Sequence, residues 1–252
     1  MFPRAAPAAW LLVLGILPLA GRLSPVAAEE ALHLGWDQCG LAGTSNKTFG
    51  CLDDVASHSL YCAFSLAQPV TDVIGLEIVV DLQHASPALP SWWDLGVGGC
   101  RYGALTASGS APAGTGCTDF WQGQATGGIQ GFKIGQPYGG ANQARIKVAL
   151  AVLSDAPRAL NATDLYYAAR IVLASNLTTG TSSCAGCSEP ACLVLNSILL
   201  LRLPGSPGGD VLLETPAPGN GTFATWQGGS GAECAAVPAR RTTWGGIKSL
   251  YR

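Results

Sequence analysis

Three tryptophans and four polar side chains gather in one stretch of the sequence, residues 91–122. Their types are those that sugar-binding sites use, because flat apolar rings stack on sugar faces and planar polar groups bond to hydroxyls. The same types also suit a small structural core in which tryptophans pack beside a disulfide and aspartates hold turns, and this role is the commoner one. The candidate ligand-binding residues are Trp92, Trp93, Asp94, Arg101, Tyr102, Asp119 and Trp121.

Two pairs of aspartates could supply the acid and the base that glycoside hydrolysis needs. Asp94 pairs with Asp119 in the first interpretation, and Asp53 with Asp54 in the second. Carboxylates in turns, however, are usually turn residues only. The sequence also contains no Gly-x-Ser-x-Gly elbow, no His-Glu-x-x-His pair and no phosphate-binding loop. We therefore expect no catalytic residues and no cofactor.

The nine cysteines all follow residue 28, and in an exported chain they indicate disulfides before metal or redox chemistry. Their spacing predicts the bridges Cys39–Cys51 and Cys100–Cys117, with two further bridges inside a C-terminal set. Cys62 is the expected free thiol, because it alternates with apolar residues on one face of a strand. The C-terminal set consists of Cys184, Cys187, Cys192 and Cys234.

The Cys-x-x-Cys spacing within that set favours neither a redox pair nor a zinc site. A thioredoxin-type pair needs a helix after a strand of a βαβ unit, which the sequence around it does not predict. Zinc needs a fourth ligand at conventional spacing, and the three histidines lie far upstream. We therefore expect no metal. The histidines are His33, His58 and His84.

The first 28 residues have the layout of a secretory signal peptide. Arg4 precedes an apolar run that is too short to span a bilayer, and small residues lead to a cleavage site after Ala28. No later stretch is long and apolar enough for a membrane helix, so we expect a secreted or cell-surface protein. Removing Arg4 and Arg22 takes the formal net charge from −2 to −4, which excludes the basic footprint of nucleic-acid binding.

Segments in which apolar and polar side chains alternate dominate the rest of the chain. Residues 70–82 show the alternation best, and residues 144–153 and 165–174 repeat it and are expected to pair with each other. The glycine-rich stretch 91–122 is expected to be one long loop. Further strands are predicted over residues 31–36, 57–66, 192–203, 211–214 and 222–227.

These segments predict an all-β fold, a two-sheet antiparallel β-sandwich of immunoglobulin-like or jelly-roll topology with disulfide-pinned loops. Residues 160–166 resemble the tyrosine corner of immunoglobulin-like sandwiches, in which a tyrosine hydroxyl bonds to upstream backbone. Tyr166 and Tyr167 both suit that role. The expected organisation is a signal peptide over 1–28, a single sandwich domain over 29–239 and a basic aromatic tail over 240–252.

The tail carries four cations and no acid, which favours docking on its own acidic domain or on an anionic partner. Its apolar residues recur at three- and four-residue steps, as on one side of a short helix. Residues 243–252 resemble the Thr-Trp-Gly-x-Ile-Lys-x-Leu-Tyr-Arg ending of a group of small exported bacterial proteins, a resemblance that implies export and no activity. The expected interaction residues are Trp244, Ile247, Lys248, Leu250, Tyr251 and Arg252.

The sequence thus predicts an exported, non-catalytic binding or surface structural module. Its expected partner is an extracellular polysaccharide or a surface protein, and its oligomeric state is left open. The alternative is a secreted sandwich-fold polysaccharide hydrolase or lyase. Burial of all three tryptophans in residues 91–122 would remove the motive for a carbohydrate site.

Overall fold

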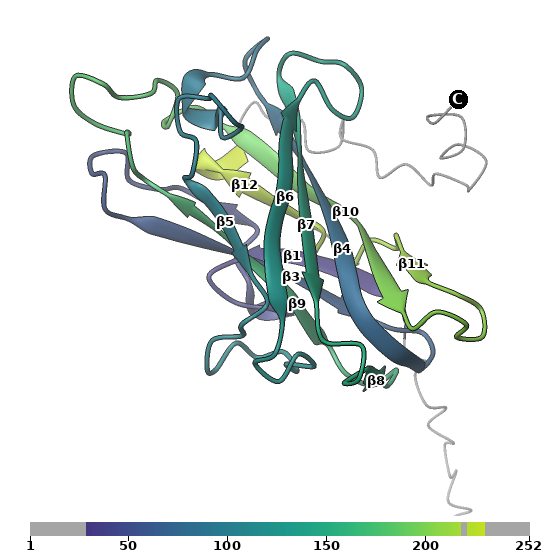
Figure 1. Ribbon diagram of the computed structural model, residues 1–252. Coiled ribbons are helices and arrows are strands. Elements are labelled where there is room, and N and C mark those ends of the chain that lie inside the picture. The colour runs from purple at the N-terminus through teal and green to yellow at the C-terminus, as the bar shows by residue number, and fades with distance from the viewer. Residues whose placement is uncertain (1–28, 218–220, 230–252) are drawn as a thin grey trace, which may run out of the picture.

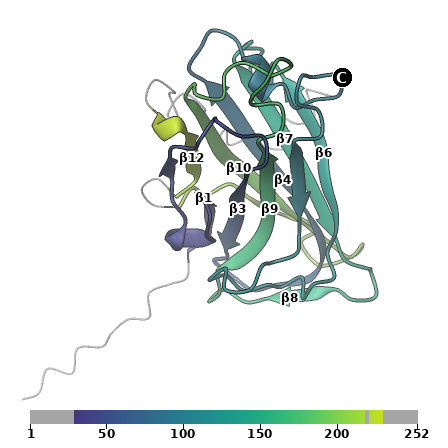
Figure 2. The same cartoon turned by 90° about the vertical axis from the view of Figure 1, so that its left-hand side faces the viewer.

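The computed structural model describes residues 29–217 and 221–229, and its strands form two sheets that face each other (Figures 1 and 2). The small sheet has the order β1 (Ala31–Trp36), β3 (Ser57–Ser65), β9 (Tyr166–Ala174), β5 (Leu105–Ser108). The large sheet has the order β2 (Asn46–Lys47), β12 (Phe223–Trp226), β10 (Ala191–Arg202), β4 (Val70–His84), β7 (Gln143–Ala151), β6 (Thr126–Ile134). Beside them, β11 (Val211–Leu213) pairs with β10 and β8 (Arg158–Leu160) pairs with β4. The predicted two-sheet β-sandwich is therefore confirmed.

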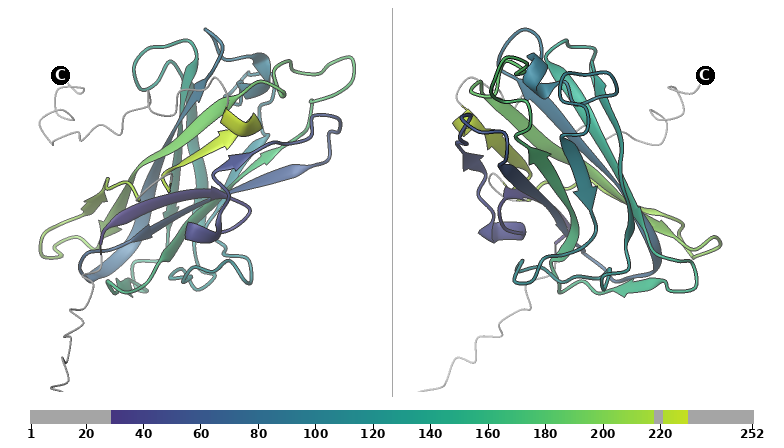
Figure 3. Two further views of the ribbon diagram at one scale, coloured as in Figure 1. Left: turned by 180° about the vertical axis from the view of Figure 1, so that it is seen from behind. Right: turned by 60° about the vertical axis from the view of Figure 1, so that its left-hand side comes forward.

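The core lies between the sheets and follows the alternation read from the sequence. On β4, the side chains of Leu76, Ile78, Val80 and Leu82 point inward and are fully buried. Glu77, which lies between Leu76 and Ile78 and points to the other face of the sheet, is exposed. This is expected for a sheet with one face in contact with solvent. Seen from behind, β1 lies nearest the viewer and covers the other side of the core (Figure 3).

The expected pairing of residues 144–153 with 165–174 is wrong. β7 pairs with β4 and β6 in the large sheet, whereas β9 pairs with β3 and β5 in the small sheet. The connection crosses between the sheets through β8, where Leu160 pairs with Val70 at the start of β4. Both faces of β9 are buried from Tyr166 to Ala169, which marks a central strand rather than one arm of a hairpin.

Residues 91–122 are not one long loop. The stretch begins with a short 3-10 helix, η2 (Ser91–Trp93), and β5 in its middle pairs with β9. Sequence reasoning missed β5 because a four-residue strand between glycines gives too short an alternation to recognise. The strand matters because it separates Trp92 and Trp93, which precede it, from Trp121, which follows it.

The predicted tyrosine corner is present, and Tyr166 fills it. The Tyr166 hydroxyl accepts a hydrogen bond from the backbone N–H of Asn161 at 2.6 Å. The hydroxyl of Tyr167 instead donates to the carbonyl of Ser108, at 2.8 Å. The corner fixes the chain just where it enters β9 after crossing between the sheets.

Candidate functional site

The predicted sugar-stacking surface does not exist as a surface. Trp92, Trp93 and Trp121 are each 0% exposed. A ring that stacks on a sugar must offer one face to solvent in the free protein, and none of these rings does. The interpretation of these three tryptophans as ligand contacts is therefore wrong, and the structural alternative describes them.

Trp92 and Trp93 belong to an aromatic cluster that fills one end of the core. Both pack against Trp226 of β12, with ring centroids 4.6 Å and 5.6 Å away, and Trp226 stacks on Phe49 at 4.1 Å. A buried indole usually finds an acceptor for its N–H, although that of Trp93 has none among the described residues. Trp92 donates to the hydroxyl of Thr178 and Trp226 to the carbonyl of Cys187. The remaining members of the cluster are Trp36 and His58.

Arg101 is fully buried beside this cluster and makes only internal contacts. Its guanidinium lies 3.6 Å from the centre of the Trp92 ring and donates to the carbonyls of Trp92, Ala174 and Asn176. Burial lowers the pKa of this guanidinium to about 10, and the charge of Asp54 acts in the opposite direction. Arg101 therefore ties η2 to the end of β9 and cannot reach a ligand.

Trp121 sits in a different aromatic group. Its ring lies 4.2 Å from that of Phe120, which in turn contacts Phe64 and Tyr166. Its indole N–H donates to the carbonyl of Ala168 at 2.9 Å. The three tryptophans that are close in sequence thus serve two separate parts of the core.

The candidate carboxylates act as turn residues. Asp119 accepts the backbone N–H of Trp121, two residues further along, and Asp53 accepts those of Val55 and Ala56. Asp54 anchors another loop, since it accepts the N–H groups of residues 178 and 179, and these bonds lower its carboxyl pKa. Asp94 is half-buried, and its backbone carbonyl accepts the N–H of Arg101. Tyr102 is 65% exposed, which leaves it the one solvent-facing aromatic of the predicted set.

The predicted bridges Cys39–Cys51 and Cys100–Cys117 are wrong, and Cys184 and Cys187 bond outside their predicted set, although seven of the eight cysteines expected in bridges are disulfide-bonded. Cys39 pairs with Cys117, Cys51 with Cys187 and Cys100 with Cys184. Sequence spacing favours local bridges, whereas the fold brings together loops that are 78 to 136 residues apart. Cys234 lies outside the described residues.

Cys62 is a free thiol with 0% exposure, as expected from its position in a buried strand. Burial raises the pKa of this thiol to about 12. A protonated, inaccessible sulfur is a poor nucleophile, so Cys62 is a packing residue.

The histidines do not form a metal site. Burial lowers the pKa of His33, His58 and His84, so all three are neutral at pH 7. Within the ranges 29–217 and 221–229, no group of three or more histidine, cysteine or acidic side chains is arranged to hold a metal ion. His58 instead packs against Phe49 in the aromatic cluster, at 4.4 Å.

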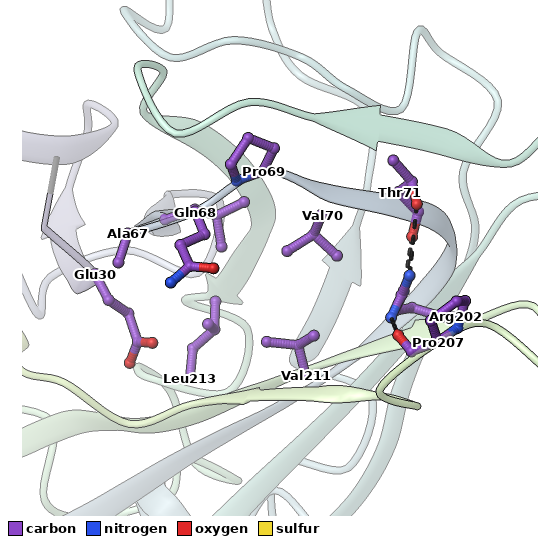
Figure 4. Close-up of a pocket in the computed structure, with 11 residues that line it drawn as sticks. Glu30, Ala67, Gln68, Pro69, Val70, Thr71, Arg202, Pro207, Val211 and Leu213 are labelled. Carbon is purple, nitrogen blue, oxygen red and sulfur yellow. Dashed lines mark hydrogen bonds between the residues drawn. The ribbon is translucent and has the colours of Figure 1, made fainter.

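An open cavity of about 400 Å³ lies at the edge of the sandwich, between the β3–β4 turn and the β10–β11 hairpin (Figure 4). Leu66, Val70 and Leu213 form an apolar floor and are almost fully buried, and Val211 adds to it from the hairpin. Gln68 extends from the turn toward Leu213 of the hairpin (Figure 4). Sequence analysis missed this site because its lining comes from three distant stretches and contains no motif.

The charged residues at the cavity rim are already committed to the fold. The Glu30 carboxylate accepts the backbone N–H groups of residues 214 and 215 and the hydroxyl of Thr215. Arg202 donates to the backbone carbonyls of Thr71, Pro207 and Gly209. The cavity therefore offers apolar contact area and few free polar groups, an arrangement that suits an apolar side chain.

Comparison with known proteins adds little to this description. No family model matches the sequence, and no curated protein matches it. The structure is similar to a cohesin module from a family 33 glycoside hydrolase of Clostridium perfringens, with 10% identity and a TM-score of 0.34 over 78% of this chain and 94% of that chain. It is also similar to a type II cohesin domain from the cellulosome of Acetivibrio cellulolyticus, with 10% identity and a TM-score of 0.30 over 79% and 95%. TM-scores this low do not establish a shared fold, so neither likeness bears on what this chain binds.

The compartment is indicated by the bridges. Three disulfides are typical of proteins that fold in an oxidising environment. No helix in the described part of the chain is long and apolar enough to cross a membrane. The predicted signal peptide, residues 1–28, and the interaction residues of the tail, from Trp244 to Arg252, lie outside the described residues.

Proposed function

We propose that this protein is an exported, non-catalytic interaction module that holds an apolar side chain of another extracellular protein in the cavity below the β3–β4 turn. The observation that carries the proposal is the apolar floor of that cavity, open to solvent at the edge of the sandwich. A rigid pocket that accepts one anchor residue is a common centre for a protein interface. The disulfides and the sequence of residues 1–28 support export.

The chemistry of the lining supports binding rather than turnover. Among the residues that the structure describes, the cavity lining contains no histidine, cysteine, serine or lysine, and its one carboxylate and one guanidinium bond to backbone. A hydrolase or lyase would need at least one nucleophile or acid–base pair facing the substrate. A polysaccharide ligand is disfavoured, since the tryptophan rings that would stack on its sugars are inside the core.

A displayed library of random peptides, panned on the purified protein, tests this proposal. We expect enriched peptides to share an apolar anchor residue. Ala67 is exposed on the turn and lines the cavity, so Ala67→Arg should block the opening and weaken binding of those peptides at least about tenfold. Ala113→Arg is the matched control, because Ala113 is exposed in the loop after β5 and lines no part of the cavity.

Three results would contradict the proposal. Enriched peptides that bind the Ala67→Arg variant as tightly as the unmodified protein would place the binding site elsewhere. Binding on a glycan array without peptide enrichment would show that the ligand is a carbohydrate, bound at a surface other than the buried tryptophans. Release of reducing ends from a polysaccharide would make the protein an enzyme.

A further inference from the structure

The outward face of the large sheet carries buried side chains where a wet face is expected. On β10, Leu193 and Leu195 point into the core, so Cys192 and Val194 between them point outward. Cys192 is nevertheless 0% exposed and Val194 6% exposed. Together with Phe223, the β12 residue opposite Val194, they form an apolar cluster separate from the main core.

Beyond the polar Asn196 and Ser197, two more apolar side chains lie on the same face. Leu199 lies opposite the exposed Glu77 and opposite Leu212 of β11, so all three share the outward face. Both leucines are only half-buried. We call the residues Cys192, Val194, Leu199, Leu212 and Phe223 the outer stripe. An apolar stripe of this length on a sheet face normally marks a covered surface.

The cysteines identify what covers it. Of the nine, six form the three bridges described above and Cys62 is free. Cys192 is disulfide-bonded as well. The ninth cysteine, Cys234, belongs to the segment that follows β12, the strand next to β10.

We propose that a Cys192–Cys234 disulfide clamps the C-terminal segment, residues 230–252, over the outer stripe. Formation of this bridge oxidises two thiols. Both electrons and both protons pass to a disulfide of an oxidant in the exporting compartment, which is thereby reduced to a dithiol. Thr225 lies directly opposite Cys192, and the described chain ends at Gly229. Five further residues reach up to about 17 Å, which is ample for the Cα separation of a disulfide.

The composition of the segment suits the stripe. After Cys234 it contains Trp244, Ile247, Leu250 and Tyr251, whose apolar area is poorly suited to free solution. The stripe extends about 23 Å along β10, from Cys192 to Leu199. The residues after Cys234 are enough to follow it, even where part of the segment turns or coils. The clamp thus keeps an apolar face of the sandwich dry, and its reduction uncovers that face.

Peptide mapping of the protein without reductant tests the bridge. We expect a linked pair of peptides, one with Cys192 and one with Cys234, in monomeric protein. Alkylation of Cys234 in the native protein, or linkage of Cys234 to any other cysteine, would overturn the proposal. A linkage found only in dimers would assign the stripe to the segment of a second copy instead.

Tryptophan fluorescence tests the cover, because the chain after residue 28 has one tryptophan besides those of the core. Acrylamide cannot reach the core indoles of Trp36, Trp92, Trp93, Trp121 and Trp226, each 0% exposed. Any quenching of the fluorescence by acrylamide therefore measures the exposure of Trp244. The Trp244→Phe variant is the control, in which no quenching is expected. We expect weak quenching in the unmodified protein and an increase of several fold in Cys234→Ser. Equally strong quenching in both proteins would refute the cover.

A second pair of variants tests the stripe with the bridge intact. Phe223→Asp places a charge on the stripe and should expose Trp244 to acrylamide. Lys147→Asp places the same charge on the outward face of β7, outside the stripe, and should leave the quenching unchanged. If both variants leave Trp244 shielded, the segment rests on another surface.

Discussion

At the scale of single residues, Arg101 is a buried charge whose hydrogen bonds go to backbone carbonyls instead of a carboxylate. Three backbone carbonyls and the face of Trp92 take the place of water around the guanidinium. A planar group with several fixed donors can satisfy this arrangement, while a point charge cannot. Arg101 thus works as a brace between η2 and β9.

Replacing Arg101 with lysine should therefore destabilise the protein although the charge is kept. We expect a loss of about 2 kcal/mol in the free energy of unfolding, because two of the three carbonyls lose their donor and the ring contact is weakened. Urea unfolding measures this loss. Lys147→Met, which removes an exposed cation, is the control and should change stability by less than about 0.5 kcal/mol. An equal effect of the two substitutions would show that the brace contributes nothing.

Cys62 should make the folded state lose stability in alkali. Burial raises its pKa from 9.0 to about 12, so between these values the unfolded chain releases a proton that the folded chain keeps. Its contribution is fully present below pH 9.0 and disappears as pH rises toward 12, with a slope of up to about 1.4 kcal/mol per pH unit. Denaturant unfolding over this range measures the slope.

Cys62→Ala provides the comparison for that experiment. The variant keeps Tyr166 and Tyr167, whose pKa values burial also raises, so only the thiol contribution is removed. The slope of Cys62→Ala should be shallower than that of the unmodified protein. Parallel slopes would mean that the tyrosines alone titrate.

Residue types were easier to predict than residue orientations. The aromatic, acidic and cationic side chains of residues 91–122 were recognised as an unusual group, but their direction depends on a strand that the sequence hardly marks. Once β5 divides the stretch, Trp92 and Trp121 enter different parts of the core. The cavity was not predictable, because Glu30, Val70 and Leu213 meet only through the fold.

At the scale of strands and loops, Asp81 connects three strands of the large sheet. It lies on β4, is 0% exposed, and accepts two hydrogen bonds from Arg145 of β7, at 2.6 Å and 2.7 Å, and one from Asn196 of β10. Asn196 falls within a bulge in the β4–β10 pairing, so the extra residue turns its amide toward the carboxylate. The bulge and the ion pair act as one unit.

Asp81→Asn should lower the free energy of unfolding by about 2 to 3 kcal/mol, since a neutral amide leaves a half-buried guanidinium without its counter-ion. Glu77→Gln, an exposed change on the same strand, should cost less than about 0.5 kcal/mol. A double-mutant cycle with Arg145→Gln should give a coupling above about 1 kcal/mol. Additive effects would argue against a shared unit.

The bridges allow a test of loop length. Removing Cys51–Cys187 as a pair of alanines should cost about 0.5 kcal/mol more than removing Cys39–Cys117, because the first bridge closes 136 residues and the second 78. Each loss should fall in the range of about 2 to 5 kcal/mol. Urea unfolding of the two double variants measures both. The reverse order would mean that local contacts, and not chain entropy, set the contribution of each bridge.

The positions of long strands could be predicted from the sequence. Which strands pair with each other could not. β4 carries many consecutive alternating residues and β10 is a long apolar run, so their positions follow from the sequence. β2, β5 and β8 are four residues long or fewer, and pairing alone defines them. The disulfide pairs failed for the same reason, since proximity across a sandwich leaves no trace in sequence spacing.

At the scale of the whole molecule, both sheets share a single continuous core. Tryptophans lie on both sides of this core, with Trp36 on β1 of the small sheet and Trp226 on β12 of the large sheet. We expect one cooperative unfolding transition in which tryptophan fluorescence and far-ultraviolet circular dichroism coincide. Separated transitions would show that the sheets unfold as independent units.

The bridge between Cys51 and Cys187 also determines how the protein bears a mechanical load. When the chain is pulled at residues 29 and 229, tension passes through the sulfur atoms and bypasses everything between the two cysteines. Before Cys187, only residues 29–51 can straighten, about a seventh of the contour length that the reduced chain over 29–187 would release. A domain linked in this way extends little under force, because the covalent bridge and not the strand pairing carries the tension.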